Sequence, residues 1–336
     1  ETDPDFSEGL PHSLGDALRR LHEDLGHEKV LEKSVATIHA GIEEFAQSVG
    51  DQPAVAERFA ASLGIIGDQG RLSDRQRLAV RRISGLVIAN ALIFQEVLSG
   101  TDARVPTLQA ILAHRDTINA LRAAWRMIVE DINYYPIFHI ASGVAEGISR
   151  QADVTAALHG LVTAALRILS ERSALRHDLM GRIYHRLLTE AKHLGAYYTS
   201  IPAATLLLKL ALEPGRWPNR TWDDLDDLKA FTVADLACGT GTLLMAAADA
   251  LHDNYVHASA SAGEAPDTNA LHEVLLGSVL HGYDVLPSAV HLTASTLALR
   301  NPEVMVQHPE LYSLPLGGDA LRLGSIEFMG GEAVPA

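Results

Sequence analysis

The chain has 336 residues and a net charge of −15, which argues against a protein whose main task is to grip phosphate backbones, since such proteins are usually basic. Its single cysteine, Cys238, excludes an internal disulfide and is typical of the reducing cytoplasm, where we expect the protein to reside. No uncharged apolar stretch reaches about 18 residues, so we expect no transmembrane helix and no membrane partner.

Residues 1–190 are predicted to form an all-α N-terminal domain, because Ala and Leu dominate and no strand-like alternation occurs. Ser73 is a typical N-cap for a long helix, and Gly100 ends that helix. Pro136 interrupts the helical pattern within NYYPIF, and a further helix follows it. Helices are also expected over about 74–98, 107–131, 153–170 and 175–193.

Residues 191–336 are predicted to form an α/β domain with a parallel sheet, since apolar runs alternate with helical patterns there. We interpret ASASAGEAPDTNA, at 258–270, as a flexible surface loop. The expected strands are FTVADL at 231–236, a run that ends at Asp284, and a run near 311–317. Helices are expected over 200–213, from the end of DLACGTGT to about 257, over 271–277 and over 287–299.

The sequence DLACGTGT, at 235–242, places a Gly-x-Gly turn between an expected strand and a helix, as nucleotide-binding turns do. A P-loop is excluded because no Gly-Lys-Ser/Thr ending occurs. A dinucleotide-binding turn is excluded because Leu244 stands where a third glycine or alanine is needed. What remains is a cofactor without a pyrophosphate, such as S-adenosylmethionine, whose positive end Asp235 can face. A purely structural turn is the alternative.

Three acids are expected at successive strand ends. Asp284, in LHGYD, follows Asp235 by about 50 residues and can accept hydrogen bonds from both ribose hydroxyls of a nucleoside. Asp319, in GGDAL, can accept a hydrogen bond from an adenine amino group. Because ligands bind at the carboxyl ends of open parallel sheets, we expect the three carboxylates to line one crevice.

Four segments, in this order, resemble the first motifs of amino-directed (adenine-N6) DNA methyltransferases: HLGAYYTSIPAATLLLKLAL, VADLACGTGTLLMAAADAL, HGYDVLPSAVHLTASTLAL and GDAL. The resemblance is greatest to the modification subunits of type I restriction systems and covers about residues 175–325. It implies an incomplete Rossmann-like methyltransferase domain over 191–336 that binds S-adenosyl-L-methionine. The implied activity is DNA adenine-N6 methylation in a restriction-modification or related bacterial defence system.

The resemblance also implies which residues hold the cofactor. Tyr198 and Thr199, with Tyr197 beside them, match the segment that holds its methionine end. Asp284 matches the acid that binds the ribose, and Asp319 the acid that contacts the adenine. The complete set of expected cofactor-binding residues is Ala196, Tyr197, Tyr198, Thr199, Ser200, Asp235, Ala237, Cys238, Gly239, Thr240, Gly241, Thr242, Asp284, Val285, Asp319 and Ala320.

The sequence departs from the family pattern in two places. Leu236 replaces the proline that usually follows the first acid, and we expect little effect because this side chain packs rather than binds. The Asn/Asp-Pro-Pro-aromatic tetrapeptide that holds the target amine is missing, and Asn301-Pro302-Glu303 comes too early and lacks the aromatic residue. We therefore assign no catalytic residue, and we expect an N-terminal piece of a longer methyltransferase that is inactive alone.

The expected partners are DNA, mainly through parts outside this chain, and a specificity or restriction subunit. The first strand of the sheet would have an unpaired edge where a fourth strand belongs, so self-association through that edge is also expected. The alternative function is a non-catalytic, methyltransferase-like interaction module that binds a partner subunit.

Three other patterns are interpreted structurally. Cys238 lies within the glycine turn, which is the wrong place for a methyltransferase nucleophile. The sixteen histidines form no zinc-spaced cluster, so no metal site is expected. The arginine-rich stretch 71–82 is interpreted as a salt-bridged helix surface, with contact to DNA phosphates as the alternative.

Overall fold

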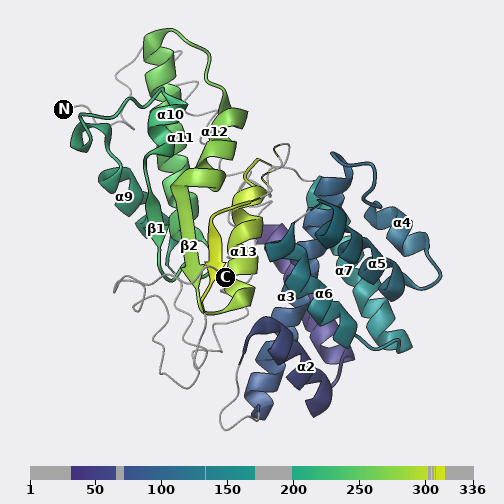
Figure 1. Cartoon of the computed structure of the whole chain (residues 1–336). Coiled ribbons are helices and arrows are strands. Elements are labelled where there is room, and N and C mark those ends of the chain that lie inside the picture. The colour runs from purple at the N-terminus through teal and green to yellow at the C-terminus, as the bar shows by residue number, and fades with distance from the viewer. Residues whose placement is uncertain are drawn as a thin grey trace, which may run out of the picture.

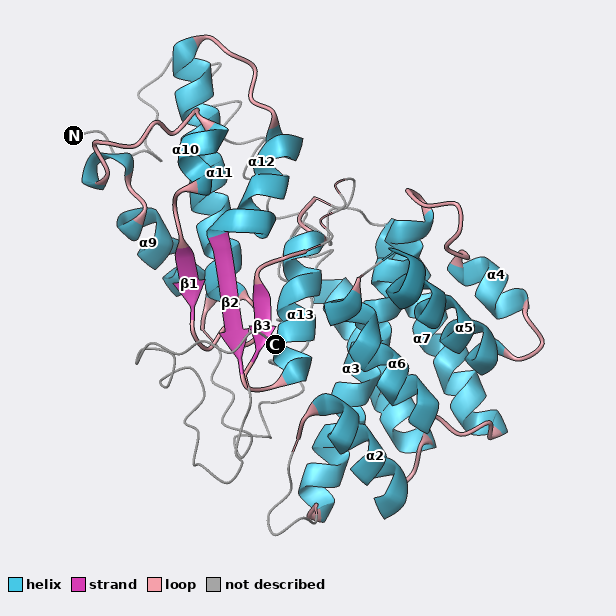
Figure 2. Cartoon of the chain, viewed as in Figure 1, coloured by secondary structure: helices cyan, strands magenta, loops and turns pink. Residues whose placement is uncertain are grey.

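The computed structural model describes residues 32–65, 72–132, 134–170, 199–301, 304, 306 and 308–314. Helices make up residues 32–170, which we call the helical domain, and all three strands of the described part lie beyond residue 230 (Figures 1 and 2). The predicted order, helices first and then an α/β part with a parallel sheet, is confirmed at this level. The expected boundary at 190/191 and the helix over 175–193 fall outside the described residues.

The helical domain is built around α3, which contacts α2, α4, α6 and α7. Its core contains fully buried aromatic side chains, including Phe59, Trp125 and Phe138. Burial of large apolar side chains is the main favourable term in folding such a bundle. Its elements are a helix over 32–48, α2 (Pro53–Leu63), α3 (Asp74–Ser99), α4 (Leu108–Ala113), α5 (Thr117–Met127), a π-helical turn (Ile128–Ile132), α6 (Tyr135–Gly147) and α7 (Ala152–Ser170).

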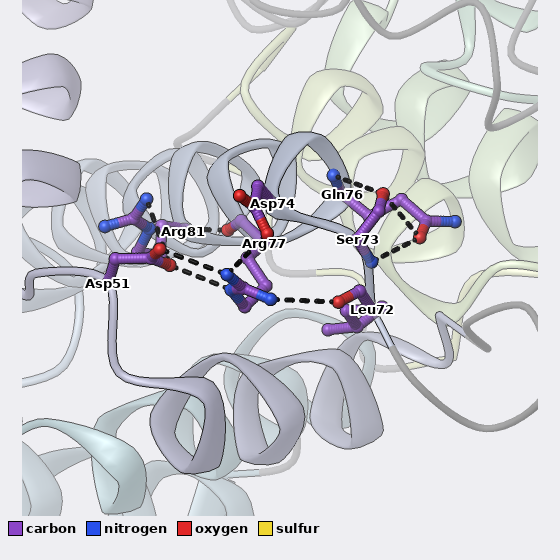
Figure 3. Close-up of polar contacts among 7 residues, drawn as sticks. All are labelled: Asp51, Leu72, Ser73, Asp74, Gln76, Arg77 and Arg81. Atoms are coloured by element: carbon purple, nitrogen blue, oxygen red, sulfur yellow. Dashed lines mark hydrogen bonds and ion pairs between the residues drawn. The ribbon is translucent and has the colours of Figure 1, made fainter.

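The start of α3 is confirmed. The Gln76 N–H donates to Ser73 Oγ at 3.4 Å, and the Ser73 N–H donates to Gln76 Oε1 at 2.8 Å (Figure 3). This reciprocal capping box satisfies N–H groups that have no partner within the helix. At the other end, Gly100 is the C-cap, as predicted.

The single helix expected over 107–131 is wrong, because the structure has two helices there. α4 ends at Ala113, and His114 adopts an extended conformation with a ψ of 137°. Asp116 then starts α5, where its side chain accepts a hydrogen bond from the Asn119 N–H at 3.0 Å. The apolar periodicity continues across the break and therefore concealed a local N-cap.

Two helices, α3 and α7, are long and apolar enough to cross a membrane when only length and composition are considered. In α3, 83% of the apolar window is buried inside the protein, and the core helix of a soluble protein passes the same test. The length and apolar composition of these two helices are therefore only weak evidence for a membrane-spanning segment.

The α/β part has three parallel strands in the order β1-β2-β3. The segment predicted as a loop at 258–270 is largely helical: α11 continues to Ala262 and ends at the left-handed Gly263, and α12 begins at Thr268. Alanine and serine at 258–262 are compatible with a helix, so only the glycine stops it. The elements are α9 (Ile201–Ala211), a 3₁₀ turn (Pro214–Arg216), α10 (Leu225–Lys229), β1 (Val233–Asp235), α11 (Thr242–Ala262), α12 (Thr268–Val274), a π-helical turn (Leu275–Val279), β2 (Leu280–Asp284), α13 (Pro287–Ala298) and β3 (Leu311–Ser313).

The helix α13 lies between the sheet and the helical domain (Figure 1). It contacts β2 and β3 on one side, and α3 and α6 on the other. On β2, Gly282 lies against Leu244 of α11 and Leu311 of β3, and a Cβ added there would approach their side chains to within 3 Å. Close packing of helix on strand thus requires a glycine in the middle of β2.

Candidate functional site

Two of the predicted acids lie at the same edge of the sheet. Asp235 is the last residue of β1, and Asp284 is the last residue of β2. Asp235 is paired with Gly282, two residues before Asp284, so both acidic side chains point to the same face of the sheet. This edge, formed by the carboxyl ends of parallel strands, is where open α/β sheets bind their ligands.

The glycine turn, residues 236–241, connects β1 to α11 through two left-handed glycines. Gly239 has a φ of 56° and Gly241 a φ of 84°, a region that other residues rarely adopt. The Cys238 N–H donates to the Tyr283 carbonyl at 2.9 Å, and the Gly241 N–H donates to the Cys238 carbonyl at 2.8 Å. These bonds hold the turn against β2 and close it on itself.

Asp284 links the glycine turn to the start of α13. Its Oδ2 accepts a hydrogen bond from the Gly239 N–H at 2.9 Å, and its Oδ1 accepts one from the Leu286 N–H at 2.9 Å. The residue is 9% exposed, and the two donors compensate for the burial of its charge. Each oxygen retains a second lone pair, which gives the carboxylate capacity for a ligand hydroxyl.

Asp235 is half-buried, and its Oδ1 accepts a hydrogen bond from the Ala237 N–H at 3.1 Å. Burial raises the pKa of the Asp235 carboxyl, and the negative charge of Asp284 raises it further, while the bond from Ala237 lowers it. Two neighbouring carboxylates disfavour an anionic ligand and favour one with positive charge or hydrogen-bond donors.

Four other predicted positions lie within the turn or next to it. Thr240 and Thr242 are buried, and their hydroxyl oxygens are 3.3 Å apart. Ala237 is exposed and Val285 is half-buried, so both are accessible at the sheet edge. The predicted segment 235–242 therefore forms one compact feature with the end of β2.

The predicted segment before the first strand is only partly described. Thr199 is half-buried, and Ser200 is the N-cap of α9, where its Oγ accepts a hydrogen bond from the Ala203 N–H at 3.4 Å. The helix α9 packs along α11, the helix that follows the turn. Among the described residues, no hydrogen bond joins Thr199 or Ser200 to the turn. The remaining predicted site residues, Ala196, Tyr197, Tyr198, Asp319 and Ala320, lie outside the described residues.

The thiol of Cys238 is buried behind the turn, and burial raises its pKa to about 12. A nucleophilic cysteine needs a lowered pKa and access to its substrate, and this thiol has neither. The interpretation of Cys238 as part of the turn rather than as a nucleophile is therefore supported.

Thr293, on α13, also contacts the turn, although no sequence pattern predicted this role. Its Oγ1 donates a hydrogen bond to the Gly239 carbonyl at 3.0 Å. A Cβ added to Gly241 would lie 3.1 Å from Thr293 Cγ2, so the same side chain is bonded to Gly239 and bounds the space next to Gly241. Position 293 lies within an apolar helix, where a threonine gives no local signal of such a role.

Three arginines in the first half of α3, Arg77, Arg81 and Arg82, are engaged in ion pairs, and Figure 3 shows those of Arg77 and Arg81. Arg77 Nε lies 2.8 Å from Asp51 Oδ1, and Arg77 Nη2 lies 2.7 Å from Asp74 Oδ1. Arg82 Nε lies 2.7 Å from Glu43 Oε1. These contacts favour the interpretation of a salt-bridged surface over that of a DNA-phosphate site.

Within the ranges that the structure describes, no group of three or more His, Cys, Asp or Glu side chains could hold a metal ion. The parallel sheet, the glycine turn and the two strand-end acids instead define a class of α/β protein with a candidate small-ligand site at the carboxyl ends of its strands.

A family model described as N-6 DNA Methylase matches residues 175–312. The chain therefore contains a domain of the adenine-N6 DNA methyltransferase family, as the sequence motifs indicated. The match includes β1, the glycine turn and β2, ends within β3, and supports a DNA methyltransferase type of function. No curated protein and no solved structure matches the chain significantly.

Proposed function

We propose that this chain binds S-adenosyl-L-methionine at the carboxyl ends of β1 and β2, as the cofactor-binding part of a DNA adenine-N6 methyltransferase. The observation that carries the proposal is the joining of Asp284 to the Gly239 N–H at 2.9 Å, with Asp235 on the same face of the sheet. The proposed site consists of residues 196–200, 235–242, 284–285 and 319–320, in a Rossmann-like domain.

Three features of the described residues support this proposal, for the carboxylate, the positive end and the ribose of such a cofactor. A Cβ at Gly239 would meet only the Ala237 carbonyl oxygen within 4 Å, so the Cα of this glycine faces open space that a ligand can enter. The first turn of α11 has no side-chain cap, and helix N-termini favour carboxylates. Asp284 can accept from ribose hydroxyls, and Asp235 suits the positive end of the ligand.

The bound cofactor would supply a methyl group on a sulfonium, which is already a strong leaving group. The residues of this chain would act by binding and orienting, since a transfer of this kind needs alignment more than acid–base help. The glycine turn would fix the methionine end, and Asp284 would fix the ribose. The buried thiol of Cys238 takes no part in this scheme.

Calorimetric titration of the whole chain with S-adenosylmethionine tests the proposal. Asp284→Asn and Asp235→Asn should each weaken binding about 10- to 100-fold, the effect of losing a hydrogen bond to a charged group. Asp253→Asn, which removes an acid on α11 far along the helix from the turn, is the matched control and should leave affinity unchanged. Absence of binding at about 1 mM, or binding that neither site substitution alters, would refute the site.

We further propose that the domain serves a restriction-modification or related defence system, with DNA and a specificity or restriction subunit as partners. A following Asn/Asp-Pro-Pro-aromatic motif in the gene would support this, because that tetrapeptide orients the target amine. Neighbouring genes for a specificity or restriction subunit would support the system assignment, and their absence would oppose it.

A second candidate function, a methyltransferase-like interaction module, is favoured by the surface of α9. Leu206, Leu207 and Leu210 are each more than half exposed, and such clusters often mark contacts between proteins. β1 is also an edge of the described sheet. Light scattering of the chain measures self-association, and Leu206→Ser with Leu207→Ser should abolish it if α9 is the interface. Self-association without cofactor binding would favour the module.

A further inference from the structure

We infer that the helical domain sets the geometry of the glycine turn through α13, with Thr293 as the positioning residue and a buried polar anchor holding the helix. The anchor consists of Asn90 on α3 and of His291 and Ser295 on α13. The consequence for cofactor affinity rests on the proposed function, whereas the effect on the turn itself does not.

The anchor is a fully buried hydrogen-bond network between the two parts of the chain. Asn90, His291 and Ser295 are each 0% exposed. Asn90 Nδ2 lies 2.9 Å from His291 Nε2 and donates to Ser295 Oγ at 2.6 Å. The Ser295 hydroxyl in turn donates to the His291 carbonyl at 3.0 Å.

The second ring nitrogen of His291 fixes the direction of these bonds. Nδ1 lies 2.8 Å from the carbonyl of Ile137 on α6, so Nδ1 carries the proton and Nε2 accepts from Asn90. Burial lowers the pKa of His291 to about 4, so the ring is neutral near neutral pH. One imidazole therefore connects α13 to both α3 and α6.

The network favours the observed seating of α13 on the helical domain. A shift of the helix that broke these bonds would leave Asn90 Nδ2 and His291 Nε2 buried without partners, which is costly in a dry interior. The start of α13 is fixed as well, because a Cβ added to Gly64, at the end of α2, would lie 2.4 Å from Pro287 Cδ. The helical domain thus holds α13 at its first turn and near its middle.

The opposite side of α13 holds the glycine turn. Residues 291 and 295 share one side of a helix, whereas residue 293 lies about 200° away from 291. Thr293 Oγ1 donates to the Gly239 carbonyl at 3.0 Å, and its side chain bounds the space next to Gly241. The position of α13 on the helical domain is therefore transmitted to the two glycines by one short side chain.

Four substitutions separate this role from general stability. Thr293→Val keeps the shape but removes the hydroxyl, and Thr293→Ser keeps the hydroxyl. Asn90→Leu removes the anchor from α3. The matched control is Gln95→Met, which also removes a buried amide from α3, but one bonded to Pro106 and Trp125 within the helical domain.

Hydrogen exchange of the whole chain without cofactor, followed by mass spectrometry over residues 236–244, is the first measurement. Thr293→Val and Asn90→Leu should speed exchange of these amides at least about fivefold, the effect of losing one hydrogen bond. Thr293→Ser and Gln95→Met should leave it near the wild-type rate. Unchanged exchange in the first two, or equal acceleration by Gln95→Met, would overturn the inference.

Titration with S-adenosylmethionine is the second measurement, with about fivefold weaker binding expected for Thr293→Val and Asn90→Leu only. If the wild type binds no cofactor, the proposed function fails, while the exchange experiment still decides the inference. If Asn90→Leu does not fold, Ser295→Ala replaces it, because it removes a single hydroxyl from the same anchor.

Discussion

Replacing Gly241 by alanine, with Gly239→Ala as its comparison, tests how the turn is packed. Both glycines have positive φ, at 84° and 56°, so alanine at either position costs about 1–2 kcal/mol. Only Gly241 is also crowded. An added Cβ would lie 3.1 Å from Thr293 Cγ2, 3.2 Å from its Oγ1 and 3.3 Å from its Cα. Such overpacking costs about 1–3 kcal/mol more.

We therefore expect Gly241→Ala to lower the free energy of unfolding by about 2–5 kcal/mol, and Gly239→Ala by about 1–2 kcal/mol. Urea denaturation followed by circular dichroism measures both values. Thr293→Ala removes the two crowding side-chain atoms, so Gly241→Ala should cost about 1 kcal/mol less in that background than in the wild type.

Equal losses for the two alanine variants would contradict this account, because the strain of a positive φ would then be the whole effect. Additive losses for Gly241→Ala and Thr293→Ala would contradict it as well, since atoms in contact should couple.

Three further predictions concern single side chains. Ser73→Ala removes the N-cap of α3 and should lower the free energy of unfolding in urea by about 1 kcal/mol; no loss would contradict the capping box. Trp125→Phe leaves the buried Gln95 Oε1 without its 2.7 Å donor and should cost about 1–3 kcal/mol in the same assay, and a neutral result would contradict that bond. Burial, aided by the charge of Arg300, lowers the pKa of His272 from 6.5 to about 4. Between these two pH values the native state binds fewer protons than the unfolded state. The stability that is present above pH 6.5 is therefore lost as the pH falls toward 4. Between about pH 7 and about pH 5, His272→Leu should lose about 2 kcal/mol less than the wild type, and equal losses would refute the assignment.

The sequence predicts well where the signal is local. The capping residues of α3 and the Gly-x-Gly turn each depend on a few neighbouring side chains, and both are confirmed. The order of strands and helices in the α/β part also follows from short apolar runs between helical patterns. Bringing Asp235 and Asp284 to one edge then requires only that the strands are parallel.

The rest depends on contacts between distant residues, which a single sequence does not display. Asn90 and His291 are 201 positions apart, and each resembles an ordinary polar residue within a helix. The role of Thr293 depends on the path that α13 takes over the turn. Even local signals compete: the apolar periodicity over 107–131 outweighed the cap at Asp116, although the cap decides where the helix breaks.

The position of the only cysteine provides a natural reporter. Cys238 is 4% exposed, and with a pKa of about 12 it carries almost no thiolate near neutral pH. An alkylating reagent such as iodoacetamide can therefore react only while this segment is transiently open. Each adduct adds one modification per chain, which mass spectrometry detects, and it records one opening of the glycine turn. The opening of the turn in native molecules can thus be followed without an engineered label.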